Sequence, residues 1–116
     1  MLGIRRGDSP EAAQALARKV AALRIMRDSG GKMSKGLADT GGGVLVVSQM
    51  TLYGDLSKGN RPSFDDVAPG AEAEPLYNSF VETLKSCGVE TVTGVFGGMM
   101  DVRLVNDGPV TFMLER

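Results

Sequence analysis

The chain has 116 residues, with 13 basic and 14 acidic side chains and a formal net charge of −1. This length suits one domain with one core, and the charge argues against a protein that coats nucleic acid, leaving room for one local patch. Histidine is absent and cysteine occurs once, which excludes His-based catalysis, His-ligated metals, disulfides within the chain and thiolate zinc clusters. We expect a cytoplasmic protein with no membrane span and no signal peptide.

The first third of the chain carries signals for one helix and a strand pair. Asp8 begins a capping-box spacing, Pro10 suits a first helical turn, and apolar residues then recur at helical spacing. This pattern predicts a helix over residues 9–22. Residues 23–26 are predicted to form a short strand, turn residues follow at 28–31, and residues 32–34 are predicted to return as its paired strand.

The middle of the chain alternates between loops and regular elements. Residues 36–43 are rich in glycine and are predicted to form a loop. The apolar run 44–47, in which three of the four residues are β-branched, predicts a central strand that is buried on both faces. The polar stretch 55–70 predicts a loop, and apolar spacing over 73–84 predicts a second amphipathic helix that ends near Gly88.

The last quarter of the chain has the alternation of strands. A strand is predicted over 91–96, and two more over 100–105 and 110–114, joined by a tight turn. With two helices and about five to six strands, residues 1–116 are predicted to form one α+β domain. Cys87 follows the apolar side of the second helix and is predicted to lie in the core.

Two polar segments could carry chemistry, although each also has an ordinary structural interpretation. Residues 48–54 are the polar exit of a buried strand, where the sheet fixes backbone donors that a ligand could use. Residues 106–109 have the sequence Asn-Asp-Gly-Pro, which suits a plain turn. The glycine clusters lack the context of a P-loop or a dinucleotide fingerprint, so they do not indicate a nucleotide site.

The same segments resemble a known family. Residues 48–55, SQMTLYGD, closely resemble the SQxTLYGD motif of the D-aminoacyl-tRNA deacylases. KGNRPSF at 58–64 is similar to that family's KGxRPSF segment, and EPLY at 74–77 to the start of its second helix. FGGMM at 96–100 and LVNDGPVT at 104–111 resemble its C-terminal signature. The resemblance covers essentially the whole chain, in the right order.

This resemblance implies an α+β fold with mixed-sheet, barrel-like β-structure and a homodimer with two sites at the subunit interface. It implies hydrolysis of the ester that joins a D-amino acid to tRNA, with glycyl-tRNA as a further substrate. We expect no cofactor, no metal, no membrane and no DNA partner.

The resemblance also implies a chirality filter. In the family a cis Gly-Pro bond reaches into the partner's site, and Gly108-Pro109 match it. Rigid carbonyls there would exclude an L side chain by a clash, which can discriminate more steeply than one favourable contact. The other substrate-binding positions implied are Asn106, Phe96, Gly98 and Met100. Gly98 departs from the family's usual alanine, which would widen the pocket.

The catalytic roles are open between two interpretations. Thr51 matches the position proposed as a nucleophile in the family, but this chain offers no base to activate it. We expect instead an oxyanion hole of backbone N–H groups near Met50 and Thr51, with water assisted by the 2′-hydroxyl of the tRNA. Gln49 and Ser48 would position the amino group and ribose. Thr51 could also be a packing residue.

Two basic residues follow the motif. Lys58 and Arg61 could meet phosphates of the tRNA acceptor end, and the alternative is an ordinary solvated loop.

The N-terminus departs from the family. Family members begin with a further hairpin and most of another strand, including an arginine that orients the Gly-Pro motif, and Leu2-Gly3-Ile4 would be the remnant of that strand. A truncated gene model, an alternative start and a true short form are all compatible with this. We expect such a form to be less stable and less soluble than an extended one. The alternative function is a non-catalytic paralogue or fragment that binds tRNA ends or a full-length partner.

Overall fold

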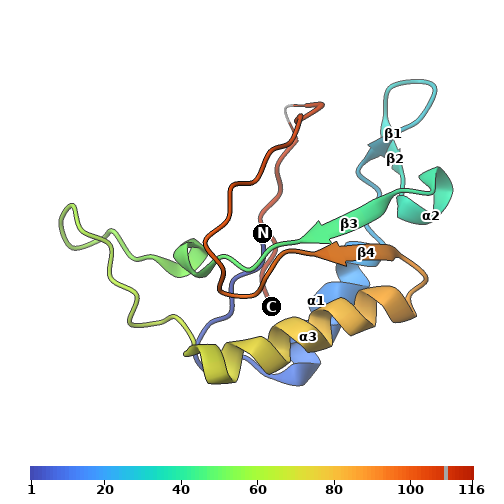
Figure 1. Ribbon diagram of the computed structural model, residues 1–116. Coiled ribbons are helices and arrows are strands. Elements are labelled where there is room, and N and C mark those ends of the chain that lie inside the picture. Colours follow the sequence, from blue (N-terminus) through green and yellow to red (C-terminus); the bar gives the residue numbers. More distant parts are fainter. Residues whose placement is uncertain (109) are drawn as a thin grey trace.

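The computed structural model describes residues 1–108 and 110–116. Figure 1 shows two long helices, α1 (Pro10–Ala21) and α3 (Gly70–Ser86), which lie beside each other under a two-stranded sheet. The strands of this sheet, β3 (Gly43–Val46) and β4 (Glu90–Thr93), pair in parallel. The α+β class and the two amphipathic helices are therefore confirmed.

Helix α1 begins one residue later than the capping signal predicts. The Ser9 hydroxyl is the N-cap and accepts a hydrogen bond from the Ala12 amide at 3.2 Å. The carboxylate of Asp8 instead accepts from the Arg5 amide at 2.9 Å. Ala17 on the inner face is fully buried. The helix was thus predicted correctly, but its capping residue was not.

Helix α3 supplies half of the buried apolar residues in the described chain. Tyr77 and Leu84 are 3% and 0% exposed, and they pack with Val46 of β3 and Ala17 of α1. The helix ends at Ser86, so Cys87 becomes the C-cap and is exposed, and the prediction that it lies in the core is wrong. The buried face of the helix comprises Ala73, Leu76, Tyr77, Phe80, Val81 and Leu84.

A small hairpin and a short helix precede β3. Strands β1 (Met26–Arg27) and β2 (Met33–Lys35) pair antiparallel, so the predicted pair is confirmed, although its first strand begins later than predicted. Helix α2 (Leu37–Thr40) forms where a loop was predicted. The Asp39 carboxylate accepts from the Gly36 amide at 2.8 Å, which stabilises this single turn.

Strand β3 is covered on one face only. Val44 and Val46 point toward the helices and pack in the core. Leu45 lies opposite Val92 of β4 on the other face, and these side chains are 51% and 56% exposed. The predicted burial on both faces is therefore wrong for this chain, because both long helices pack against the same side of the sheet.

The C-terminal quarter does not form the strands predicted over 100–105 and 110–114. In the described residues, β4 is the last strand, and the chain beyond it runs out and back as an extended loop (Figure 1). Alternation makes a segment compatible with a strand, but a strand forms only where a second backbone supplies hydrogen bonds.

Candidate functional site

The first part of the site is the segment that leaves β3. After Val47 the chain passes through Ser48 and Gln49 and enters the 3-10 helix η1 (Met50–Tyr53). Leu2 runs parallel to this segment, where its amide donates to the Val47 carbonyl and its carbonyl accepts from the Gln49 amide, both at 2.8 Å. These two bonds fix the backbone around Ser48.

The 3-10 turn determines which backbone donors are free within the helix. The Leu52 amide donates to the Gln49 carbonyl at 3.4 Å, and the Gly54 amide to the Thr51 carbonyl at 3.1 Å. The N–H groups of Met50 and Thr51 stand before the first such bond and have no partner within the helix. Met50 and Thr51 are both exposed. Among the described residues, no hydrogen bond joins the Thr51 hydroxyl to a carboxylate or an amine.

The second part of the site is the turn that follows β4. The Gly97 amide donates to the Ser48 hydroxyl oxygen at 3.1 Å, which links this turn to the first segment. Gly97 has φ +66°, a conformation that favours glycine, and the Gly98 amide donates to the Val95 carbonyl at 3.1 Å. Phe96 is half-buried here.

Tyr77 of α3 supports both parts from below. Its hydroxyl donates to the Val46 carbonyl at 2.9 Å, and its ring lies 5.3 Å from that of Phe96 at an angle of 57°. Burial raises the pKa of Tyr77, so its hydroxyl stays protonated and remains a donor at neutral pH. The aromatic pair sets the position of Phe96 relative to the end of β3.

The remaining positions implied for the chirality filter are spread along the C-terminal segment. The thioether of Met100 folds back and accepts from the Val95 amide at 3.3 Å. Asn106 and Gly108 are exposed, and in the described residues no hydrogen bond joins them to Ser48 or Thr51. Pro109 lies outside the described residues. The structure thus brings together Ser48, Phe96, Gly97 and, through Val95, Met100 and Gly98.

The basic residues occupy a loop that follows η1 directly. Lys58 and Arg61 are exposed, and two backbone hydrogen bonds of 2.9 Å between Asp55 and Ser63 close the loop at its base. The amide and hydroxyl of Ser57 donate to the Asp55 carboxylate and lower its pKa. The loop is therefore anchored beside the 3-10 helix, with its two cations free to meet solvent or a ligand.

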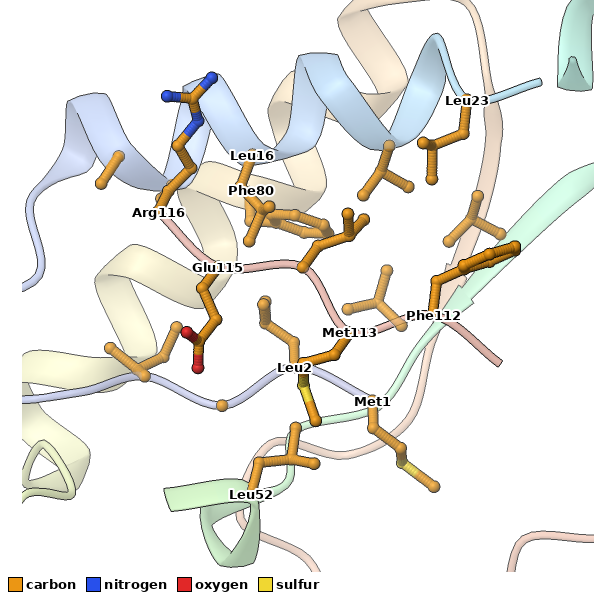
Figure 2. A pocket seen from close by; sticks show the side chains of 18 of the residues that line it. Met1, Leu2, Leu16, Leu23, Leu52, Phe80, Phe112, Met113, Glu115 and Arg116 are labelled. Carbon is orange, nitrogen blue, oxygen red and sulfur yellow. The ribbon is translucent and has the colours of Figure 1, made fainter. Parts of the chain in front are cut away.

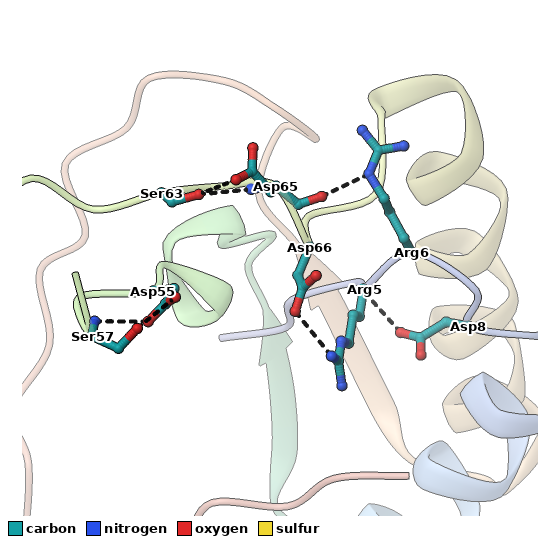
Figure 3. A network of polar contacts seen from close by, with 8 residues as sticks. All are labelled: Arg5, Arg6, Asp8, Asp55, Ser57, Ser63, Asp65 and Asp66. Atoms are coloured by element: carbon teal, nitrogen blue, oxygen red, sulfur yellow. Dashed lines mark hydrogen bonds and ion pairs between the residues drawn. The ribbon is translucent and has the colours of Figure 1, made fainter.

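A second anchor joins this loop to the N-terminal segment (Figure 3). Arg5 forms an ion pair with Asp66 at 2.9 Å, and Arg6 donates through Nε to the Asp65 carbonyl at 2.8 Å. The Ile4 carbonyl accepts from the amide at position 68 at 3.1 Å. Sequence reasoning missed this role of Arg5 and Arg6, because their partners lie about sixty residues away and no spacing rule connects them.

Gly3 is a second position that sequence reasoning missed. A Cβ atom on Gly3 would lie 3.0 Å from Cδ2 of Tyr53 and 3.2 Å from the Gln49 carbonyl oxygen. The absence of a side chain lets the N-terminal segment approach η1 closely. Burial raises the pKa of Tyr53, with a smaller contribution from nearby Asp8. Glycine between two apolar residues was the only sequence signal for this contact.

A large apolar cavity lies beside the core and reaches Leu52 and Tyr53 of the 48–55 motif. It has a volume of about 520 Å³ and lies between α1, β3, the N-terminal segment and residues 110–116. Figure 2 shows Leu16, Phe80, Phe112 and Met113 around it, with Glu115 and Arg116 beside it. Its lining is mostly apolar, so we regard it as loosely filled core and place the chemistry at the Ser48–Gly97 junction.

Within the described parts of the chain, no helix is both long and apolar enough to cross a membrane. Nor do the described residues gather three His, Cys, Asp or Glu side chains that could hold a metal ion.

Comparisons with known proteins agree on one family. The profile of the family described as D-Tyr-tRNA(Tyr) deacylase matches residues 1–115. A D-aminoacyl-tRNA deacylase of Thermomicrobium roseum is 56% identical over 115 residues, which are 99% of this chain and 75% of that protein. A D-aminoacyl-tRNA deacylase of Halalkalibacterium halodurans is 50% identical over 99% of this chain and 79% of its own length.

Solved structures show the same fold. A c-Myc DNA unwinding element binding protein superposes with a TM-score of 0.84 at 39% identity, over 94% of this chain and 74% of that one. A probable eukaryotic D-amino acid tRNA deacylase has a TM-score of 0.76 at 17% identity, over 94% of this chain and 77% of its own, and is evidence of fold alone. From the family profile and these identities, the chain belongs to the D-Tyr-tRNA(Tyr) deacylase family.

Proposed function

We propose that this protein hydrolyses the ester bond between a D-amino acid and tRNA, releasing the amino acid and free tRNA. Its family membership and the relatives named D-aminoacyl-tRNA deacylase support this activity. The observation that locates the proposed activity is the hydrogen bond between Ser48 and Gly97. This bond joins the two segments that resemble the family's signature motifs.

The proposed chemistry relies on backbone donors. Attack of water on the ester carbonyl places negative charge on its oxygen, and the N–H groups of Met50 and Thr51 would stabilise that charge. The terminal 2′-hydroxyl of the tRNA would assist the attacking water, since the chain has no histidine. The ester C–O bond then breaks and the 3′-oxygen leaves with a proton. Gln49 and Ser48 would position the amino group and the ribose.

The proposed selectivity rests on exclusion. Gly108 and Pro109, with Asn106, would face the side of the substrate where an L side chain projects. Phe96, Gly98 and Met100 would line the rest of the pocket. We propose that the filter of one subunit completes the site of a second, in a homodimer whose sheets together form a barrel-like structure. The exposed position of Asn106 and Gly108, without a hydrogen bond to the Ser48 segment among the described residues, supports completion by a partner.

The proposed tRNA contact is small. Lys58 and Arg61 would meet phosphates of the acceptor end, which suits a chain with net charge −1. Glycyl-tRNA is a further proposed substrate, because glycine has no side chain for the filter to exclude. We place this activity in the cytoplasm, as one domain over residues 1–116, without a cofactor.

The test compares enantiomers. Purified protein is incubated with tRNA charged with labelled D-tyrosine or L-tyrosine, and release of the label is followed over time. We expect release of D-tyrosine at a rate at least about 10²-fold that of L-tyrosine, as steric exclusion can provide. Equal rates would reject the filter role of Gly108 and Pro109. Binding of both charged tRNAs without hydrolysis would instead support a non-catalytic tRNA-binding protein.

A further inference from the structure

We infer that Ser48 is a positioning residue, whose hydroxyl oxygen holds the two halves of the site at a fixed separation. This inference rests on the proposed function for its catalytic consequence, but not for its geometry. It adds to the proposed substrate contact of Ser48 a second role, which is to hold the protein's own backbone in place.

The first step is where the strand ladder stops. Strands β3 and β4 pair as far as Val46 and Thr93. The last backbone hydrogen bond between the two segments runs from the Gly94 amide to the Val46 carbonyl at 3.1 Å. Beyond that point the two segments diverge: the segment after β3 enters η1, and the segment after β4 enters the turn around Gly97. Ser48 lies two residues past the end of the ladder.

The second step is what replaces the missing backbone bond. The Gly97 amide donates to the Ser48 side-chain oxygen at 3.1 Å. The acceptor that joins the two segments is here a side-chain hydroxyl instead of a backbone carbonyl. On its other side Ser48 is bracketed by the two 2.8 Å bonds of Leu2 to Val47 and Gln49. The Leu2 segment, the Ser48 segment and the Gly97 turn therefore lie side by side.

The third step is that both partners are rigidly held. Gly97 has φ +66°, and its turn is closed by the 3.1 Å bond from the Gly98 amide to the Val95 carbonyl. Phe96 next to it packs against the buried Tyr77 ring. A fixed Ser48 oxygen therefore fixes the proposed oxyanion donors of η1 relative to Phe96 and Gly98.

The variants are chosen to separate positioning from direct contact with substrate. Ser48→Ala removes the acceptor, and Ser48→Thr keeps it. Ser86→Ala is the matched control, because the Ser86 hydroxyl donates to the Thr83 carbonyl at 2.7 Å at the far end of α3. The first readout is amide hydrogen exchange at Gly97 without substrate, and the second is kcat and KM for D-tyrosyl-tRNA.

We expect Ser48→Ala to raise exchange at the Gly97 amide by about tenfold and leave exchange at Leu84 unchanged. We expect kcat to fall by about tenfold with little change in KM, because misplaced groups weaken the transition state more than binding. Ser48→Thr should restore both values, and Ser86→Ala should alter neither.

Two results would overturn the inference. One is unchanged exchange at Gly97 in Ser48→Ala, which would show that the hydrogen bond does not hold the turn. The other is faster exchange with unaltered kcat, which would show that the bond is not needed for the site. If the wild-type protein releases no D-tyrosine, the proposed function fails, and the exchange arm still decides whether Ser48 holds the turn.

Discussion

At the scale of single residues, the structure favours backbone groups over side chains as the source of catalysis. Among the described residues the Thr51 hydroxyl has no hydrogen bond to a basic group, whereas the Thr51 amide lies before the first hydrogen bond of η1. Unactivated hydroxyls are weak nucleophiles, while fixed N–H groups stabilise an oxyanion without any proton transfer. The two interpretations of Thr51 therefore predict different outcomes for its removal.

We expect Thr51→Ala to keep deacylation within about threefold of wild type, because the substitution keeps the backbone N–H. A tRNA ending in 2′-deoxyadenosine should lose about 10²-fold or more, since it lacks the assisting hydroxyl. Single-turnover deacylation of D-tyrosyl-tRNA measures both. A loss of about 10⁴-fold in a folded Thr51→Ala protein would indicate a nucleophile or an essential proton transfer instead.

Gly3 gives a second residue-scale prediction, on packing. A Cβ at this position would press on the Tyr53 ring at 3.0 Å and on a backbone oxygen at 3.2 Å. We expect Gly3→Ala to lower the free energy of unfolding by about 1–3 kcal/mol, as overpacking does. Gly70→Ala is the control, because a Cβ at the first position of α3 meets nothing within 4 Å. Urea denaturation that shows equal stability of both variants would contradict the close approach of the N-terminal segment to η1.

At the scale of elements, the hairpin of β1 and β2 depends on one carboxylate. Asp28 accepts from the Ser34 hydroxyl at 2.6 Å and from the amides of Gly30 and Lys32 at 2.9 and 3.0 Å. The Ser34 hydroxyl and then the Lys32 amide lower the pKa of Asp28 below its ordinary value. Its contribution to the hairpin is therefore complete at neutral pH and lost as the pH falls through the lowered pKa.

We expect Asp28→Ala to speed amide exchange at Gly30 and Lys32 at pH 7 and to have little effect at a pH below the lowered pKa, where the wild-type carboxyl is itself protonated. Ser29→Ala, one residue along the same turn, is the matched control. Exchange rates in α3 should not change in either variant. A Ser29→Ala variant that disturbs the hairpin as much as Asp28→Ala would show that the carboxylate has no special role.

The elements also show how far the sequence alone could be read. Both long helices were predicted closely, because an apolar face and its end signals are local properties. The short helix α2 was missed, since its glycine-rich neighbours resemble a loop and a single Asp39 contact decides its turn. The strands over 100–105 and 110–114 were predicted wrongly, because alternation carries no information about where a partner strand lies.

The candidate site divides in the same way. The motif residues of 48–55 and 96–100 could be found by resemblance, and the structure joins them through Ser48 and Gly97. The ties of Arg5 and Arg6 could not be found, since long-range ion pairs leave no periodic signal. Pro109 lies outside the described residues, so its role as part of a chirality filter stays a prediction.

At the scale of the whole molecule, burial is uneven on the two sides of the sheet. One face of β3 and β4 meets both long helices, and the core residues with the lowest exposure, Leu84 and Ala17, lie there. The opposite face presents Leu45 and Val92, each about half exposed. Stability should therefore come almost entirely from the helical side, since apolar stabilisation follows the area removed from water.

This asymmetry predicts a sharp difference between two leucines. Leu84→Ala should lower the free energy of unfolding by about 2–5 kcal/mol, because Leu84 is fully buried and its loss leaves a cavity in the core. Leu45→Ala should cost about 1 kcal/mol or less, and Leu45→Lys should be tolerated equally well, because a half-exposed lysine keeps its charge in water. Urea denaturation at low protein concentration measures all three. If Leu45→Lys unfolds the chain as readily as Leu84→Ala does, the second face of the sheet is covered in solution. The central strand would then be buried on both sides, as its apolar run first predicted.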